Sequence, residues 1–146
     1  MLAIFEKVHI FAGMDTPALD LLLGRAQKHD FAPGEVILRE GDMGNRFYLV
    51  ISGRVSICKH FGTPDQMTLT HIGPEDFFGE MCILEAATRS ATVVADERAE
   101  CMSLSSMDFL KLYEAIPAQY SILVLNIARD LSRRLRSMDK QFAGRH

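Results

Sequence analysis

Residues 77–94 read FFGEMCILEAATRSATVV, and this stretch carries the most specific chemical pattern in the chain. Gly79 permits a tight turn and a close approach of the backbone to a ligand. Residues 80–84 can form one helical turn, and the free N–H groups at its start favour an anion. Arg89 follows Glu80 by nine residues and can return to the same place, where its planar guanidinium would neutralise a phosphate.

The carboxylate of Glu80 decides what kind of anion fits this stretch. A carboxylate repels a bare phosphate, but it accepts a hydrogen bond from a sugar hydroxyl. A phosphate with an adjoining ribose hydroxyl is part of a nucleotide. The residues alone leave a second interpretation open, in which Glu80 and Arg89 form an ion pair that only steadies a loop.

The region around this stretch, from about residue 31 to residue 105, has the pattern of short strands. β-Branched and aromatic runs alternate with turn dipeptides such as Pro33-Gly34 and Ser52-Gly53. Short strands with turns every eight to twelve residues are typical of an antiparallel sandwich or barrel. The runs are 36–38, 47–51, 55–58, 67–72, 91–95 and 101–104.

Helical patterns flank this region on both sides. From residue 2 to about residue 28, apolar side chains recur at three- and four-residue steps, with Asp15 as a cap and Pro17 at an early helix position. After the strands, Ser105 can cap a short helix and Pro117 can begin a longer one.

The longer helix has two apolar faces. Leu123 and Ile127 form one face, which can pack on the chain's own domain. The other face repeats in steps of four and three residues, which is the spacing of a coiled coil. Its members are Val124, Ala128, Leu131, Leu135, Met138 and Phe142. Such a stripe usually packs a helix on its own domain, but the first face can do that here, so we predict a parallel homodimer through residues 124–142.

The composition is that of one ordinary globular domain. The chain has 146 residues, a formal net charge of −3 and 48% hydrophobic residues, which argues against disorder. The longest uncharged run, residues 115–128, is short of the ~20 residues that a membrane-spanning helix needs. Three cysteines without CxxC spacing indicate neither a disulfide framework nor a zinc site. We therefore expect a cytoplasmic protein without a metal, a cofactor or a membrane segment.

The sequence also lacks the patterns of common enzyme sites. There is no G-x-S-x-G, no H-E-x-x-H and no phosphate loop that ends in Gly-Lys-Ser/Thr, so we expect no enzyme. Residues 129–146 carry six Lys and Arg against two Asp and Glu. Cations at the end of a helix complement its dipole, and contact with nucleic acid or a membrane surface is the alternative.

Two segments resemble the signatures of the cyclic nucleotide-binding domain family. Residues 77–94 are similar to the family's phosphate-binding cassette, which runs F-G-E-(L/M)-A-(L/I), a variable stretch, then R-(A/S/T)-A-T-V. Residues 33–55, PGEVILREGDMGNRFYLVISGRV, are similar to its other signature, P-G-x-x-I-x-x-x-G-D-x-x-x-x-(F/Y)-Y-x-(V/I)-x-S-G-x-(V/A). The opening segment 11–14 and the closing helix also fit, so the resemblance spans nearly the whole chain.

The resemblance implies one ligand site. Glu80 would bind the ribose 2′-hydroxyl, and Arg89 would pair with the cyclic phosphate. In this family a threonine directly after the arginine tends to favour cGMP, whereas alanine or serine accompanies cAMP, so Ser90 favours cAMP over cGMP. Cys82 replaces the usual alanine without removing a ligand contact. The implied ligand-binding set, which includes backbone amides and wall positions, is Gly79, Glu80, Met81, Cys82, Arg89, Ser90 and Ala91.

Purine recognition does not follow from the resemblance. In a member that regulates transcription the base contacts come from a Thr-Ser pair on the long helix, and Arg134-Leu135 stand at that place here. Arg133 and Arg134 are therefore candidates for stacking on a purine. A solvated helix face is the alternative role for both.

The resemblance implies a fold as well. We expect an α+β chain, with an antiparallel β-roll that is jelly-roll-like and has about eight strands, N-terminal helices, and a long C-terminal helix. We interpret residues 1–146 as a single cyclic nucleotide-binding domain. It would be helical over 1–28, form the β-roll with its cassette over 29–105, and end in helices over 106–142.

The expected function is that of a sensor module, which binds a cyclic nucleotide and moves its C-terminal helix as the output to a downstream protein. Members that regulate transcription follow this helix with a helix-turn-helix domain, and we expect no DNA-binding motif in this chain. Two alternatives stay open. One is a structural or interaction domain that dimerises and has an unused or differently filled pocket, and the other is the sensor fragment of a larger transcription regulator.

Overall fold

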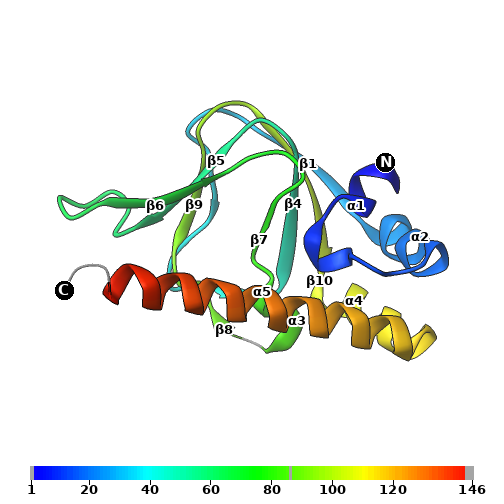
Figure 1. The fold of residues 1–146 in the computed structure, drawn as a ribbon. Helices are drawn as coiled ribbons and strands as arrows, with labels where there is room; N and C mark the ends of the chain where they lie inside the picture. Colours follow the sequence, from blue (N-terminus) through cyan, green and yellow to red (C-terminus); the bar gives the residue numbers. More distant parts are fainter. Residues whose placement is uncertain (1, 86, 144–146) are drawn as a thin grey trace.

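The structure is a computed structural model that describes residues 2–85 and 87–143. Figure 1 shows a roll of strands, with short helices at one end and a long helix beneath it. In chain order the helices are α1 (Leu2–Glu6), the 3-10 helix η1 (His9–Phe11), α2 (Thr16–Arg25), α3 (Met81–Leu84), α4 (Ser106–Ala115) and α5 (Pro117–Ala143). In the described part of the chain, no helix has both the length and the apolar character needed to span a membrane.

The strands of the described residues form two four-stranded antiparallel sheets and one small pair. They are β1 (Gln27–Phe31), β2 (Val36–Leu38), β3 (Met43–Gly44), β4 (Arg46–Ser52), β5 (Val55–Lys59), β6 (Met67–Ile72), β7 (Phe77–Phe78), β8 (Ala87–Thr88), β9 (Thr92–Ala95) and β10 (Ala99–Ser105). The sheet orders are β1-β10-β4-β7 and β2-β9-β5-β6, and β3 pairs with β8. The predicted antiparallel β-roll with a long C-terminal helix is confirmed.

The turn between β4 and β5 passes the chain from the first sheet to the second. Gly53 in this turn has a φ of 84°, a conformation that residues with a side chain rarely adopt. A Cβ at this position would also clash with the carbonyl oxygen of Arg98. Glycine is therefore required here both for the backbone conformation and for the close packing of the two segments.

The N-terminal helical region is shorter than its sequence pattern predicts. α2 is capped by Asp15, whose carboxylate accepts a hydrogen bond from the Ala18 N–H at 3.0 Å. The helix ends at Arg25 instead of near residue 28, because residues 27–31 form β1 and pair with β10. This pairing gives hydrogen-bond partners to the backbone groups of β10 that face β1. A longer helix would have left those groups unpaired at the edge of the sheet.

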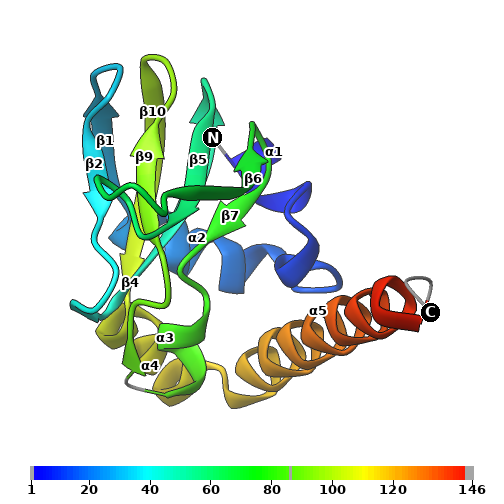
Figure 2. The ribbon, with the colours of Figure 1, turned by 90° about the vertical axis from the view of Figure 1, so that its left-hand side faces the viewer.

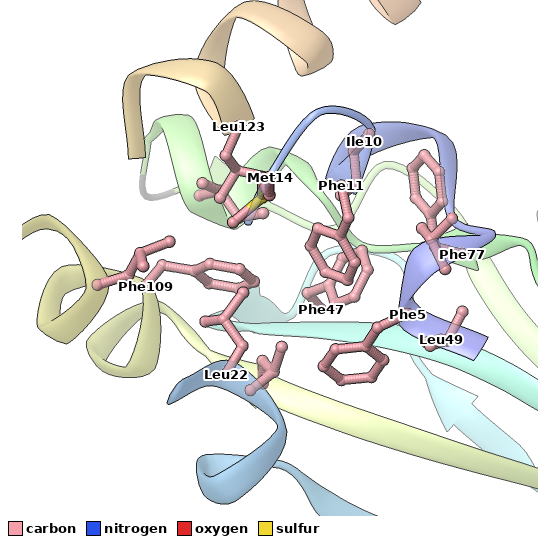
Figure 3. Close-up of a cluster of buried hydrophobic side chains, with 14 of the residues drawn as sticks. Phe5, Ile10, Phe11, Met14, Leu22, Phe47, Leu49, Phe77, Phe109 and Leu123 are labelled. Carbon is pink, nitrogen blue, oxygen red and sulfur yellow. The ribbon is translucent and has the colours of Figure 1, made fainter. Parts of the chain in front are cut away.

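The main hydrophobic core lies where the helices meet the first sheet (Figure 3). The ring of Phe47 on β4 has its centroid 5.9 Å from the centroids of both Phe11 and Phe109, which come from η1 and α4. Leu123 of α5 enters the same core, and both Leu123 and Ile127 are fully buried. The predicted packing of this face of α5 on the chain's own domain is confirmed.

The other apolar face of α5 is increasingly exposed toward the C-terminal end. Leu131 packs against the core, whereas Leu135 and Met138 are 61% and 63% exposed. The side chain of Phe142 lies outside the described residues. Figure 2 shows this end of α5 running clear of the roll. The homodimer through residues 124–142 stays a prediction, for which Leu135 and Met138 are the exposed surface.

Candidate functional site

A cavity of about 720 Å³ is lined by the roll and by α5. This volume falls within the ~300–1,000 Å³ that is typical of small-molecule sites. Two residues of α5, Leu131 and Arg134, join the cassette in forming its wall. The structure brings together the whole predicted ligand-binding set, and the members that line the cavity are Gly79, Glu80, Met81, Cys82, Arg89, Ser90 and Ala91.

A one-turn helix and a glycine shape the cassette. α3 covers residues 81–84 of the turn predicted over 80–84, with Glu80 as its N-cap, and Gly79 has a φ of 81°. A Cβ on Gly79 would lie 2.8 Å from the carbonyl oxygen of Arg46 and 2.9 Å from Nη1 of Arg89. The backbone can approach the guanidinium this closely only because the residue is glycine.

The guanidinium of Arg89 is fixed in place beside the cavity. Its Nη2 donates to the carbonyl oxygen of Arg46 at 2.7 Å. A Cβ on Gly44 would overlap the guanidinium, so Gly44 packs against it from the other side. The buried Nε has no hydrogen-bond partner among the described residues. A fixed guanidinium that lines the cavity is suited to bind an anion that enters it.

The segment 33–55 supports the cassette directly, which explains why two separate signatures occur in one chain. The N–H of Arg89 donates to the carbonyl oxygen of Asp42 at 2.7 Å, and the N–H of Gly41 donates to the carbonyl oxygen of Arg89 at 2.8 Å. β3 and β8 then pair through Met43 and Thr88. The backbone of the first signature therefore sets the position of the arginine in the second.

Glu80 is almost completely buried, with 6% of its surface exposed. Its Oε1 accepts a hydrogen bond from Nη1 of Arg134 at 2.8 Å, and this arginine comes from α5. Within residues 2–85 and 87–143, no ion pair joins Glu80 to Arg89. The alternative in which these two residues pair with each other to steady a loop is therefore wrong.

The two arginines considered for purine stacking lie in different places. Arg134 lines the cavity, whereas Arg133 does not. The side chain of Arg133 is 57% exposed and lies 3.6 Å from the Asp130 carboxylate. The structure thus brings one of the two candidates to the site.

The sequence analysis missed the wall that faces the cassette. Leu69, Thr70 and His71 of β6 line the cavity together with Ile57 of β5. The side chain of Leu69 is 51% exposed. A single exposed apolar residue is not by itself a sign of a binding surface, so this wall is found only after the strand has been placed next to the cassette.

Cys82 belongs to the wall of the cavity and is not poised as a nucleophile. Burial raises the pKa of its thiol to about 11, while Arg89 opposes this increase and Glu80 adds to it. The thiol is therefore protonated at neutral pH, and a thiol is a weak nucleophile compared with a thiolate.

The comparison with protein families agrees with this geometry. The family model of the cyclic nucleotide-binding domain matches residues 28–115, which is more than half of the chain. The chain therefore belongs to the cyclic nucleotide-binding domain family.

Individual relatives are regulatory proteins. The chain is 37% identical over 131 residues to the cyclic AMP receptor protein of Thermus thermophilus, and the match covers 89% of this chain and 58% of that protein. It is 33% identical to the cAMP-dependent protein kinase regulatory subunit of Dictyostelium discoideum, over 73% of this chain and 34% of that one. The crystal structure of the N-terminal domain of a transcriptional regulator from Streptomyces coelicolor matches with a TM-score of 0.81, at 25% identity, over 92% of this chain and 94% of that one.

Proposed function

We propose that the chain binds a cyclic nucleotide in this cavity and acts as the sensor part of a regulatory protein. One observation carries the proposal: a buried carboxylate and a guanidinium held in place by a hydrogen bond line the same cavity. Glu80 would accept a hydrogen bond from the ribose 2′-hydroxyl, and Arg89 would neutralise the cyclic phosphate. A nucleotide is a common metabolite that presents both a phosphate and a ribose hydroxyl.

The other residues of the set complete the proposed contacts. Backbone N–H groups or contacts at the cavity wall would come from Gly79, Met81 and Cys82. The contacts to the phosphate would be completed by Ser90 and Ala91. Serine at position 90 favours cAMP, and the names of the similar Thermus and Dictyostelium proteins also refer to cAMP. We therefore propose cAMP as the ligand, with cGMP as its competitor.

Movement of α5 is the proposed output. The helix meets the cassette through the ion pair of Arg134 with Glu80, and Leu131 of the helix lines the cavity. The Tyr120 hydroxyl also lies 3.5 Å from the carbonyl oxygen of Ile83 in α3. A ligand that binds more tightly to one position of the helix shifts the population toward that position. A downstream protein would read this shift.

We also propose a homodimer through residues 124–142, because Leu135 and Met138 expose an apolar stripe with coiled-coil spacing. The role is regulatory and not enzymatic, in keeping with the regulatory relatives. The cytoplasm is the proposed compartment, since the three cysteines are free. Residues 1–146 are proposed to act as one domain.

The main alternative is a dimerisation domain with an unused or differently filled pocket. The burial of Glu80 counts against it, because withdrawing a carboxylate from water costs stability that a structural domain could avoid with an apolar residue. The other alternative, a sensor fragment of a larger transcription regulator, makes the same prediction for ligand binding.

A thermal-shift titration with cAMP, cGMP and AMP tests the proposal. A ligand at a hundred times its dissociation constant stabilises a protein by about 2.7 kcal/mol, which corresponds to roughly 5–15 °C in Tm for a domain of this size. We expect this shift with cAMP and none with AMP.

Two arginine variants extend this experiment, one at the site and one as its control. Arg89→Ala should abolish the shift at the same cAMP concentration. Arg98→Ala should retain it, because Arg98 pairs with Asp30 on the surface, with 69% of its side chain exposed. No shift with either cyclic nucleotide at millimolar concentration, in protein that unfolds cooperatively, would contradict the proposed function.

A further inference from the structure

Arg134 belongs to a network of four charged side chains that links α5 to the cassette. Its Nη1 donates to Glu80, and its Nη2 lies 2.9 Å from Oδ2 of Asp130, in ion-pair contact but outside hydrogen-bond geometry. Asp130 also lies 3.6 Å from Arg133. Glu80 is thus the member that comes from the roll, and the other three come from one turn of α5.

The formal charges of this network cancel, because two carboxylates face two guanidinium groups. The positive charge of Arg89 is then left for a ligand with one negative charge, such as a cyclic phosphate. Loss of Arg134 would leave Glu80 as a buried carboxylate without a partner, in the same cavity as the phosphate. Like charges repel strongly where water is excluded, so the anion would bind less tightly.

The contact of Arg134 with Glu80 leaves a place for the ribose. Arg134 binds Oε1, and Oε2 has no hydrogen-bond partner among the described residues. A carboxylate can accept several hydrogen bonds, so Glu80 can bind a ribose hydroxyl while Arg134 holds its other oxygen. The Glu80 side chain is 8% exposed and that of Arg134 is 51% exposed, so the arginine is the partner with freedom to move.

We infer that Arg134 is a positioning residue of the nucleotide site, which holds and neutralises Glu80 so that this carboxylate can bind the ribose without repelling the phosphate. The inference rests on the proposed function, and it gives Arg134 a role different from purine stacking. Since Arg134 stands on α5, the ion pair couples ligand affinity to the position of the helix. Such coupling is reciprocal, so a displacement of α5 that breaks the pair weakens nucleotide binding.

A double-mutant cycle of Arg134→Ala and Glu80→Gln, with cAMP binding measured by calorimetry, tests this role. In the parent background, Arg134→Ala should weaken cAMP binding by about tenfold or more, because it leaves a buried charge unpaired. In the Glu80→Gln background there is no charge to neutralise, so the same substitution should change affinity by less than about threefold. Glutamine keeps a carbonyl oxygen for the ribose hydroxyl, which keeps binding measurable.

Arg136→Ala is the matched control, since Arg136 is an exposed arginine on the same helix that does not line the cavity. It should bind cAMP within twofold of the parent. Arg134→Gln provides a second test variant, which retains a donor but no charge, and it should weaken binding as Arg134→Ala does. Circular dichroism melting identifies any variant that does not fold.

Each result decides between named roles. An equal loss from Arg134→Ala in both backgrounds would show a direct contact with the nucleotide and overturn the inference. Unchanged or tighter binding by Arg134→Ala would also overturn it, because the arginine would then be neutral toward the ligand or compete with it. If neither the parent nor Arg136→Ala binds cAMP or cGMP, the proposed function itself fails, and that outcome is distinct from the other two.

Discussion

The two halves of α5 are held in different ways. The inner half, residues 117–131, places Leu123 and Ile127 in the core with no exposed surface. In the same half, Nδ2 of Asn126 donates to the carbonyl oxygens of two residues near η1, at 2.9 and 2.8 Å. Apolar burial and backbone hydrogen bonds therefore fasten this half to the fold.

The outer half, residues 132–143, has exposed side chains from position 132 to position 140. Among the described residues, its polar contact with the roll is the ion pair of Arg134 with Glu80. A half-helix held by one partly exposed ion pair can move at a small cost in free energy. The two halves of α5 therefore differ in what holds them, and we expect the outer half to move more easily than the inner half.

The largest effect should come from the inner half. Leu123→Ala should lower the free energy of unfolding by about 2–5 kcal/mol, because it removes a fully buried side chain and leaves a cavity. Leu135→Ala is the matched substitution in the outer half, and at a protein concentration low enough for the chain to be monomeric it should lower the free energy of unfolding by less than about 0.5 kcal/mol. Urea denaturation of both variants measures the difference. Equal losses would show that the two halves are held alike.

Asn126 should have the next largest effect. Asn126→Ala should lower the free energy of unfolding by about 1–3 kcal/mol, because it leaves the carbonyl oxygens of Ile10 and Ala12 without their donor. Ser132→Ala, at an exposed position of the outer half, should have no measurable effect. An Asn126→Ala protein as stable as the parent would mean that water replaces these two hydrogen bonds.

Dimerisation should depend on the outer half while folding does not. A double substitution, Leu135→Asp with Met138→Asp, should convert the proposed dimer to a monomer, because charges on the stripe repel each other across a coiled-coil seam. Light scattering after size-exclusion chromatography measures the mass. The free energy of unfolding extrapolated to low protein concentration should change by less than about 0.5 kcal/mol. A parent protein that is monomeric even at high concentration would contradict the proposed dimer.

The smallest effect should come from acidification, which concerns β1 and neither half of α5. Burial and, secondarily, the charge of Arg46 lower the pKa of His29 from its usual 6.5. The unfolded chain then binds the proton more readily than the folded one, so stability is full above pH 6.5 and is lost as the pH falls through the folded-state pKa. Urea denaturation at pH 7.5 and pH 5.5 should show this loss in the parent.

Two variants sharpen this pH test. His29→Gln should reduce the loss, because glutamine carries no proton-dependent charge. The destabilisation by Leu123→Ala should be equal at both pH values, since its cause is apolar packing. A loss of the same size in His29→Gln and in the parent would assign the pH dependence to other groups.

Local patterns predicted much of the fold. The Asp15 cap and the turn of α3 depend on residues within a few positions of one another, and the structure contains both. Ser105 and Asp108 similarly form a reciprocal capping box at the start of α4. The helical pattern predicted up to about residue 28 is wrong for β1, which begins at residue 27. The partner of this strand, β10, lies about seventy residues further along the chain, so no local pattern indicates the pairing.

The candidate site shows the same difference between local patterns and long-range contacts. Neighbouring residues were enough to predict the cassette: a glycine that allows a close approach, a carboxylate at the start of one helical turn, and an arginine nine residues later. The pairing of Glu80 with Arg134, which is 54 residues away, and the position of Arg89 between Gly44 and Gly79 became known from the folded chain. Short-range hydrogen bonds and backbone conformations are encoded by neighbouring residues, whereas the partner of a buried charge is chosen by the packing of whole elements.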